Sequence, residues 1–303
     1  MVQNSYILTF SCTDAVGIVA AVTGLLADND GFILDSQQYA DLGSGNFFMR
    51  VAFRGAGPRF PENLAGVEAA FAPIIARFAM TARISDTSVK PRFLIAVSQG
   101  SHCLNDLLHR WSTGNLAIDI VGVVSNHDNL RRLTEWHGLP FHHLPVSDAN
   151  RAEQEAAIMA LMADADYLVL ARYMQILSNG MSAALAGRAI NIHHSFLPGF
   201  KGAKPYHRAH ERGVKLIGAT AHVVTADLDE GPIIEQAVER VDHRDTVDDL
   251  IRIGRDIEAQ VWDIEAKEQV EGRDIEAQVL ARAVTMVAQQ RVLIDGRKTV
   301  VFR

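Results

Sequence analysis

Hydrophobic and polar positions follow two different periods over the first 86 residues. Apolar side chains at every second position predict strands, and apolar side chains three and four positions apart predict helices. The strands are expected at residues 6–10, 32–39, 47–53 and 80–84. The helices are expected at residues 19–26 and 61–78. The resulting order, β-α-β-β-α-β, is typical of a ferredoxin-like domain.

A second pattern begins after the polar segment 87–91, which ends in proline and is expected to be a linker. Short, uninterrupted apolar runs now alternate with helical spacing, as they do where strands are buried on both faces. The runs predict strands at residues 93–97, 118–124, 167–171 and 189–193. The helical spacing predicts helices at residues 102–111 and 130–137. This alternation indicates a Rossmann-like, mostly parallel sheet flanked by helices.

The C-terminal part keeps a helical pattern and contains an exact repeat. Thr246 and Asp249 predict a helix start of the capping-box type, with Asp in place of Glu. The octapeptide at residues 254–261 recurs at residues 272–279, an offset of 18 residues. A helix with about 3.6 residues per turn completes five turns over this offset, so its apolar face stays in phase. We interpret the repeat as a local duplication without catalytic meaning, rather than as a selected extension.

The two patterns define an α/β protein with two domains. The ferredoxin-like domain is expected at residues 1–86, and the Rossmann-like domain at residues 92–303, where an Asp295-Gly296 turn predicts a terminal hairpin. The length of 303 residues agrees with this division, since domains average roughly 150 residues. Hydrophobic residues make up 48% and charged residues 21%, which excludes disordered, collagen-like and coiled-coil chains.

Charge and cysteine content exclude several classes of partner. The net charge of −7 offers no basic face for nucleic acid and keeps the protein off anionic membranes. The two cysteines, Cys12 and Cys103, lack zinc-ligand spacing, so we expect no metal site. A nucleophilic Cys103 is one alternative, but a small buried helix residue is the favoured interpretation. Because neither a signal peptide nor a long apolar run is found, a cytoplasmic location is expected.

Candidate chemistry is concentrated in residues 191–202. Asn191 and His193 lie two positions apart on a predicted strand, so their side chains point to one face of the sheet. They stand near the carboxyl end of this strand, where open α/β sheets bind ligands. An amide that stabilises an oxyanion and an imidazole that moves a proton are the groups that acyl transfer requires.

A second candidate segment covers residues 218–232. His222 falls on a predicted strand, and Asp229 falls in the loop before Gly231-Pro232. A carboxylate held there can orient a water molecule and pair with a histidine. Taken singly, each of these residues would more often be structural, because strand-end Asn, isolated His and Asp before Gly are common in turns and cores. The two complete motifs together favour a catalytic site.

Both motifs resemble those of the folate-dependent formyltransferase superfamily and, more narrowly, of the formyltetrahydrofolate deformylases. The first motif reads Asn-Ile-His-His-Ser-Phe-Leu-Pro from residue 191, and the second reads His-Val-Val-Thr-Ala-Asp-Leu-Asp-Glu-Gly-Pro from residue 222. Supporting segments lie at residues 125–128, 171–178 and 204–206. Residues 12–19 are similar to the opening turn of an ACT domain, which implies a regulatory or oligomerisation role for the N-terminal domain.

The resemblance implies a catalytic trio of Asn191, His193 and Asp229 that acts without a metal or a separate cofactor, since the folate is the substrate. Asp229 is preferred to Asp227 because its spacing from His222 and Gly231 matches the family pattern. The resemblance also implies that the folate pterin docks near residues 170–177 and the Asp229 loop. The substrate-binding residues expected on this basis are Arg172, Tyr173, Met174, Gln175, Ile176 and Leu177.

The implied activity is hydrolysis of 10-formyltetrahydrofolate to formate and tetrahydrofolate, which supplies formate to one-carbon and purine metabolism. The alternative is transfer of the formyl group to an amine such as glycinamide ribonucleotide. Residues 98–104 lack the glycine-rich phosphate loop of the ribonucleotide enzymes, and His194 stands where those enzymes usually have proline. Both features, together with the ACT-like domain, favour water as the acceptor.

A third hypothesis is an amino-acid sensor without catalysis. ACT domains often bind small amino acids near the turn that here spans Asp14 to Gly17. The intact set of Asn191, His193 and Asp229 argues against this hypothesis. An amino-acid effector of an active enzyme, and a homo-oligomer formed through the ACT-like domain, both stay open.

Overall fold

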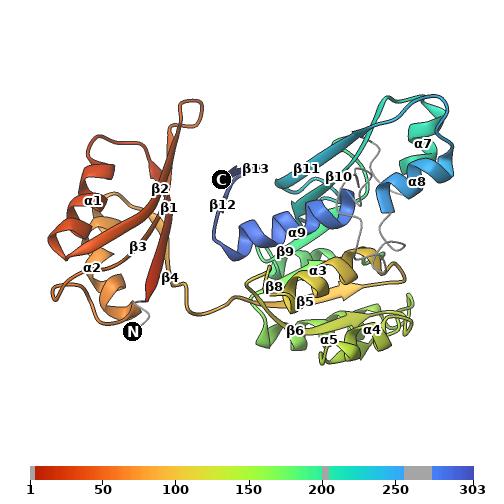
Figure 1. The fold of residues 1–303 in the computed structure, drawn as a ribbon, viewed down its shortest axis with the longest axis horizontal. Helices are drawn as coiled ribbons and strands as arrows, with labels where there is room; N and C mark the ends of the chain where they lie inside the picture. The colour runs from red at the N-terminus through yellow and green to blue at the C-terminus, as the bar shows by residue number, and fades with distance from the viewer. Residues whose placement is uncertain (1–3, 200–204, 256–274) are drawn as a thin grey trace, which may run out of the picture. The chain divides into compact units, whose positions relative to one another are not determined.

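The computed structural model describes residues 4–199, 205–255 and 275–303. The chain forms two compact units, each with its own sheet and core (Figure 1). The N-terminal unit comprises Met1–Lys90, Gln289–Asp295 and Thr299–Arg303. The larger unit comprises Pro91–Ala288 and Gly296–Lys298.

The N-terminal unit is a four-stranded antiparallel sheet with two helices. Its elements are β1 (Ser5–Thr13), α1 (Ile18–Asp28), β2 (Gly31–Asp41), β3 (Asn46–Gly55), α2 (Leu64–Arg77) and β4 (Thr81–Asp86). The strand order β2-β3-β1-β4 places β3 and β1 at the centre. Every neighbouring pair is antiparallel. The order of the elements confirms the predicted ferredoxin-like fold.

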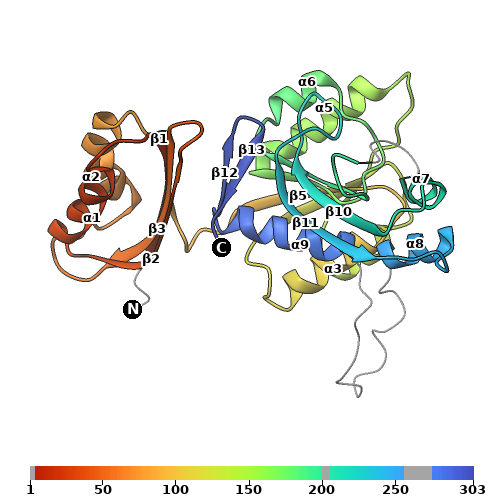
Figure 2. The ribbon, with the colours of Figure 1, turned by 90° about the horizontal axis from the view of Figure 1, so that it is seen from above.

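The core of this unit lies between the sheet and the two helices. Figures 1 and 2 show α1 and α2 on the same face of the sheet. Val22 of α1 and Phe71 of α2 pack in one buried cluster with the strand residues Phe10 and Phe53. This is the arrangement that the two hydrophobic periods predict, because one face of each strand and one stripe of each helix are apolar.

The larger unit contains a seven-stranded sheet of order β11-β10-β9-β8-β5-β6-β7. Its strands are β5 (Arg92–Val97), β6 (Asp119–Ser125), β7 (Phe141–His143), β8 (Tyr167–Leu170), β9 (Ala189–His193), β10 (Leu216–Val223) and β11 (Ile233–Arg240). The pairs from β7 to β9 are parallel. Strand β10 pairs antiparallel with both β9 and β11. The sheet is therefore mostly parallel, as predicted, with an antiparallel edge.

Helices cover both faces of this sheet (Figure 2). They are α3 (His102–Ser112), α4 (Arg131–Trp136), α5 (Arg151–Leu161), α6 (Asn179–Ala184), α7 (Pro205–Glu211), α8 (Val247–Arg255) and α9 (Ile275–Ala288), and a 3-10 turn spans Met162–Asp164. On one face, Ile158 of α5 and Met181 of α6 pack against Leu94 and Leu170. On the other, α9 packs against α3 and across β9, β10 and β11. None of the helices in the described ranges combines the length and apolar content that crossing a bilayer requires.

The strand order reverses between β5 and β8, which are parallel neighbours near the centre of the sheet. From β5 the chain moves to β6 and β7 on one side, and β8 and β9 then extend the sheet on the other. The connections that follow β5 and β8 therefore separate and leave a crevice at the carboxyl ends of these strands. Open α/β sheets bind their ligands at such a point. The topology places the segments after residues 97 and 170 beside this crevice.

The capping signal at one helix start agrees with the structure, whereas two elements are not predicted. The backbone N–H of Thr246 donates to Oδ2 of Asp249 (2.9 Å), and the N–H of Asp249 donates to Oγ1 of Thr246 (3.2 Å), which confirms the capping box. The hydrophobic pattern predicts neither β7 nor α5, because neither carries a strong apolar period. The continuous helix predicted across the octapeptide repeat falls mostly on residues 256–274, outside the described ranges.

The C-terminal hairpin belongs mostly to a different unit from the one expected from the sequence, which was the Rossmann-like domain. Strands β12 (Val292–Asp295) and β13 (Lys298–Val301) flank the predicted turn, but most of this segment groups with the N-terminal unit. The side chain of Arg50, buried in β3, donates from Nε to the carbonyl oxygen of Gln289 (3.3 Å). Asn46 donates to the carboxylate of Asp295 (3.2 Å). Long-range polar contacts of this kind leave no periodic signal in the sequence.

We predict that Phe53→Ala destabilises the N-terminal unit by about 3–5 kcal/mol, because it removes a fully buried ring and leaves a cavity. Phe53 contacts the rings of Tyr6, Phe60 and Phe71. Urea unfolding of the full chain, followed by circular dichroism, measures the effect. Phe53→Leu is the matched control and is expected to cost less. Equal midpoints for Phe53→Ala and the wild type would contradict this account of the core.

Candidate active site

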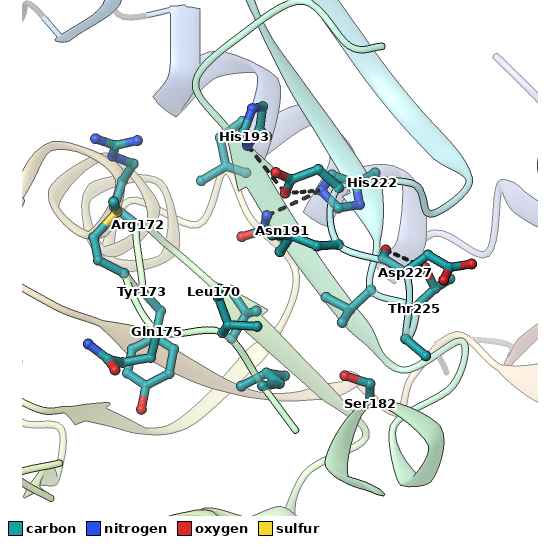
Figure 3. Close-up of a pocket in the computed structure, with 18 of the residues that line it drawn as sticks. Leu170, Arg172, Tyr173, Gln175, Ser182, Asn191, His193, His222, Thr225 and Asp227 are labelled. Atoms are coloured by element: carbon teal, nitrogen blue, oxygen red, sulfur yellow. Dashed lines mark hydrogen bonds and ion pairs between the residues drawn. The ribbon is translucent and has the colours of Figure 1, made fainter. Parts of the chain in front are cut away.

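A cavity of about 330 Å³ opens where three segments of the larger unit meet. Its walls are residues 170–177 after β8, residues 191–194 at the end of β9, and the loop 224–229 between β10 and β11 (Figure 3). Apolar side chains line it beside a few polar groups, a mixture that suits a ring-containing ligand oriented by few hydrogen bonds. The six predicted substrate-binding residues and the three predicted catalytic residues all line this one cavity.

The polar end of the cavity is set by the pairing of β9 with β10. In this antiparallel pair His222 lies directly opposite Asn191, and Thr220 lies opposite His193. A β-bulge between Ala221 and His222 interrupts the pairing of β10 with β11. Bulges redirect side chains and are frequent beside active sites. The two strands thereby bring together polar residues that lie 31 positions apart in the sequence.

Asn191 and His222 form a hydrogen bond whose direction follows from a second contact. Nδ1 of His222 lies 3.0 Å from the carbonyl oxygen of Val223, which can only accept, so we assign the ring proton to Nδ1. Burial lowers the pKa of His222 and keeps the ring neutral, although the Val223 contact and the Asp229 charge oppose this shift. Nε2 therefore accepts from Nδ2 of Asn191 (3.2 Å). This bond orients the Asn191 amide at the cavity wall (Figure 3).

His193 and Asp229 form the second polar pair of the cavity. Nδ1 of His193 lies 3.3 Å from Oδ1 of Asp229, and both side chains are only 6% exposed. Across the described ranges, Nε2 of His193 is buried without a hydrogen-bond partner. A buried nitrogen in this state is costly unless a ligand satisfies it. The ring is thus anchored at one nitrogen and available to a ligand at the other.

The loop that carries Asp229 depends on an unusual backbone and a close approach. Asp229 has a φ of 57°, in the left-handed region that most residues avoid. At Gly231 the chain passes so near β10 that an added Cβ would lie 1.7 Å from the carbonyl oxygen of Val223. The N–H of Val223 donates to the carbonyl of Pro232 (2.9 Å) and closes this turn. Gly231 therefore has a steric role that its place in the motif did not explain.

The wall formed after β8 is held at three successive residues. Arg172 has a left-handed φ of 62°, and its side chain pairs with a buried carboxylate on α9. The Tyr173 hydroxyl accepts a hydrogen bond from Nε2 of Gln154. The N–H of Met174 donates to Oγ of Ser98 (3.0 Å). Of the predicted substrate-binding residues, Tyr173 is mostly buried and Met174 is exposed, so their side chains contribute differently to the wall.

The ring of His194 packs next to that of His193 and is uncharged. Its ring centre is 5.2 Å from that of His193 and 5.9 Å from that of Tyr206. Burial lowers the pKa of His194 to about 3, and the neighbouring Arg172 cation contributes to the shift. The ring therefore adds packing but no charge next to His193 at neutral pH.

One cluster in the described ranges has the donor types of a metal site. Ligand atoms of His102, Cys103 and Glu276 lie within 4.8 Å of one another. The carboxylate is already engaged, because Oε1 accepts from the hydroxyl of Tyr206 and Oε2 accepts from His102 and pairs with Arg172. A cation there would compete with the Arg172 guanidinium. The cluster fits an ion-pair network better than a metal site, and Cys103 is buried in α3 as the sequence suggested.

Sequence reasoning missed the roles of two residues at this site. The sequence predicts that His222 lies on a strand, but its bond to Asn191 depends on the register of β9 and β10, which the sequence does not reveal. In the sequence, Glu276 belongs to the second octapeptide, and nothing there distinguishes it from Glu258 in the first. Its position beside Arg172 follows from the packing of α9.

Fold and cavity together define a protein of the formyltransferase class. The family model described as "Formyl transferase" matches residues 91–263, which contain Asn191, His193 and Asp229. Similarity to individual proteins extends over the whole chain. The formyltetrahydrofolate deformylase of Corynebacterium sp. (strain P-1) is 44% identical over 99% of both chains. That of Bacillus subtilis (strain 168) is 46% identical over 97% of this chain and 93% of the relative.

A solved structure gives the same result. The crystal structure of a formyltetrahydrofolate deformylase from Pseudomonas syringae pv. tomato superposes with a TM-score of 0.90 and 45% identity. The match covers 99% of this chain and 95% of that one. The chain belongs to the formyltetrahydrofolate deformylase family. This confirms the resemblance drawn from the two motifs.

We predict that Gly231→Ala lowers the turnover of the enzyme at least 100-fold, which corresponds to about 2.7 kcal/mol in the barrier. The added Cβ cannot coexist with the Val223 carbonyl, so the loop must move and Asp229 with it. Steady-state kinetics of the folded variant measures the effect. Gly180→Ala is the matched control, because its Cβ would meet only Oγ of Ser178 at an ordinary 3.8 Å. Wild-type turnover for Gly231→Ala would contradict the steric role.

Proposed function

We propose that this protein hydrolyses 10-formyltetrahydrofolate to formate and tetrahydrofolate, and that the folate is substrate rather than cofactor. The observation that carries the proposal is the polar end of the cavity. There Nε2 of His193 and the amide of Asn191, beside the Asp229 carboxylate, would donate to the formyl oxygen. Membership of the deformylase family over nearly the full chain supports water as the acceptor.

The folate would bind with its ring system against residues 170–177 and the loop 224–229. Leu170, Leu177 and Val224 supply apolar surface, and the segment 172–174 is fixed by the hydrogen bonds described above. The formyl group would then lie at the polar end, near Asn191 and His193. We assign Arg172, Tyr173, Met174, Gln175, Ile176 and Leu177 to this wall as binding residues.

In the proposed reaction, Asp229 takes a proton from a water molecule, directly or through His193, while the water oxygen attacks the formyl carbon. Nε2–H of His193 and the Asn191 amide then donate hydrogen bonds to the resulting oxyanion. Collapse breaks the bond between the formyl carbon and N10, and the proton taken from water passes to N10. Tetrahydrofolate leaves, and formic acid loses its remaining acidic proton to give formate. His222 acts by orienting Asn191.

Formate release without any amine acceptor tests this function directly. The purified full chain is incubated with 10-formyltetrahydrofolate alone, and formate is quantified. Sustained release is expected. If turnover began only on addition of glycinamide ribonucleotide, with the formyl group passing to its amine, the transferase alternative would replace the hydrolase. That alternative is not favoured, because the full-length relatives are deformylases.

We predict that Asp229→Asn lowers turnover by about 100- to 10,000-fold, the range expected for loss of a general base. Binding of tetrahydrofolate should change little, because the amide keeps the shape of the carboxylate. Asp227→Asn, two residues earlier in the same loop, is the matched control and should lose far less activity. Rates and a tetrahydrofolate titration are compared for the three proteins. An Asp229→Asn enzyme within threefold of wild type would remove Asp229 from the mechanism (threefold is roughly 0.6 kcal/mol).

We further propose that the N-terminal unit is an ACT-type module that binds an amino-acid effector or pairs copies of the chain. Its support is the βαββαβ order and the turn at Asp14 to Gly17, where Gly17 has a φ of 95° and is the N-cap of α1. The division at residues 86 and 92, the homo-oligomer and the cytoplasmic location stay predictions of the sequence.

Calorimetric titration with glycine and with methionine tests the effector role. A bound amino acid is expected to release or absorb heat and to change the rate of formate release. Gly17→Val is expected to abolish that heat, since a β-branched residue is strained at this positive φ. Absence of heat, combined with an unchanged rate, would contradict the effector role and leave the pairing role.

A further inference from the structure

A buried carboxylate outside the proposed catalytic trio makes three polar contacts behind the cavity. Glu276, on α9, has no exposed surface. Its Oε1 accepts from the hydroxyl of Tyr206 (2.8 Å), and its Oε2 lies 3.0 Å from Nε2 of His102 and 3.2 Å from Nε of Arg172. The Arg172 side chain is only 11% exposed. Both charges are therefore removed from water, and each is the counter-ion of the other.

Arg172 is the residue through which this carboxylate meets the active site. It lines the cavity assigned to the folate and also a neighbouring polar cavity of about 810 Å³. Its φ of 62° turns the chain after β8 and directs residues 173–177 along the cavity wall. For an arginine this conformation is strained, and it persists only where the surroundings impose it. The side chain of this strained residue is anchored by the ion pair from Nε to Glu276.

We propose that Glu276 is a positioning residue for folate binding: its buried carboxylate holds Arg172 in the left-handed conformation that shapes the 172–177 wall. Neutralising Glu276 leaves the Arg172 cation buried without an anion, and such a cation moves toward solvent. Arg172 then relaxes to an ordinary backbone conformation and the wall changes shape. The effect is expected in folate binding and KM, with a smaller effect on kcat, because the trio is not displaced.

The test measures the dissociation constant of tetrahydrofolate for the full-length wild type, Glu276→Gln, Arg172→Gly and the double variant. Glu276→Gln is expected to weaken binding about tenfold or more, whereas the same change in the Arg172→Gly background is expected to have less than about a twofold effect. Glycine adopts a positive φ without strain, so Arg172→Gly should also bind more tightly than Arg172→Ala. Unchanged binding by Glu276→Gln, or an equal loss in both backgrounds, would overturn the proposal.

The repeat supplies a matched control. Glu258 occupies the same position in the first octapeptide as Glu276 does in the second. Glu258→Gln is expected to bind tetrahydrofolate as the wild type does. Weaker tetrahydrofolate binding by Glu258→Gln, with unchanged binding by Glu276→Gln, would assign the positioning role to the first octapeptide and contradict the proposal.

Folding of the variants is tested in the same series. If Glu276→Gln is insoluble, the double variant carries the test, because it contains neither the buried cation nor its counter-ion. It is expected to fold and to bind like Arg172→Gly. A double variant that also fails to fold would show that Glu276 acts independently of Arg172, against the proposal.

The proposal rests on the proposed function, because it concerns the folate wall, but the two can fail separately. Binding of tetrahydrofolate requires no turnover. A wild type that binds tetrahydrofolate without releasing formate would contradict the hydrolase and leave the Glu276 comparison intact. Formate release by the wild type, with equal binding by Glu276→Gln, would contradict only the role of Glu276.

Discussion

The antiparallel pairing of β9 with β10 is the constraint on which the active site depends. The register of this pair places His222 opposite Asn191. The side chain of His193, also on β9, contacts Asp229 in the loop that follows β10. A shift of one residue would send these side chains to the other face of the sheet. The antiparallel edge on an otherwise parallel sheet is therefore the part of the fold that assembles the polar end of the cavity.

Two strained backbone positions extend this arrangement. Asp229 and Arg172 are both non-glycine residues with positive φ, and they lie on the two loops that enclose the cavity. Each side chain is engaged by a group of opposite or complementary character, His193 for Asp229 and Glu276 for Arg172. Strain of this kind clusters at functional sites and is sustained by the surrounding structure. Gly231 contributes by removing the Cβ that would prevent the loop from closing.

The sequence predicted what is local and periodic. The period-two and helical patterns gave the ferredoxin-like order and the parallel strands, and two motifs gave Asn191, His193 and Asp229 as neighbours. It could not predict the tautomer of His222, because the tautomer depends on a contact with a backbone carbonyl. It could not predict the position of Glu276 either, because Glu258 occupies the same place in an identical octapeptide. The positive φ of Arg172 could not be predicted either, because arginine, unlike glycine, is not a residue type that indicates this conformation. These features arise from long-range packing.

The central claim is that water attacks the formyl carbon inside this cavity. Turnover of 10-formyltetrahydrofolate in water enriched in ¹⁸O, followed by mass spectrometry of the formate, tests it most directly. The account predicts that each formate molecule carries one oxygen atom from the solvent and that no amine is required. Formate without solvent oxygen, or a formylated amine as the only product, would contradict it.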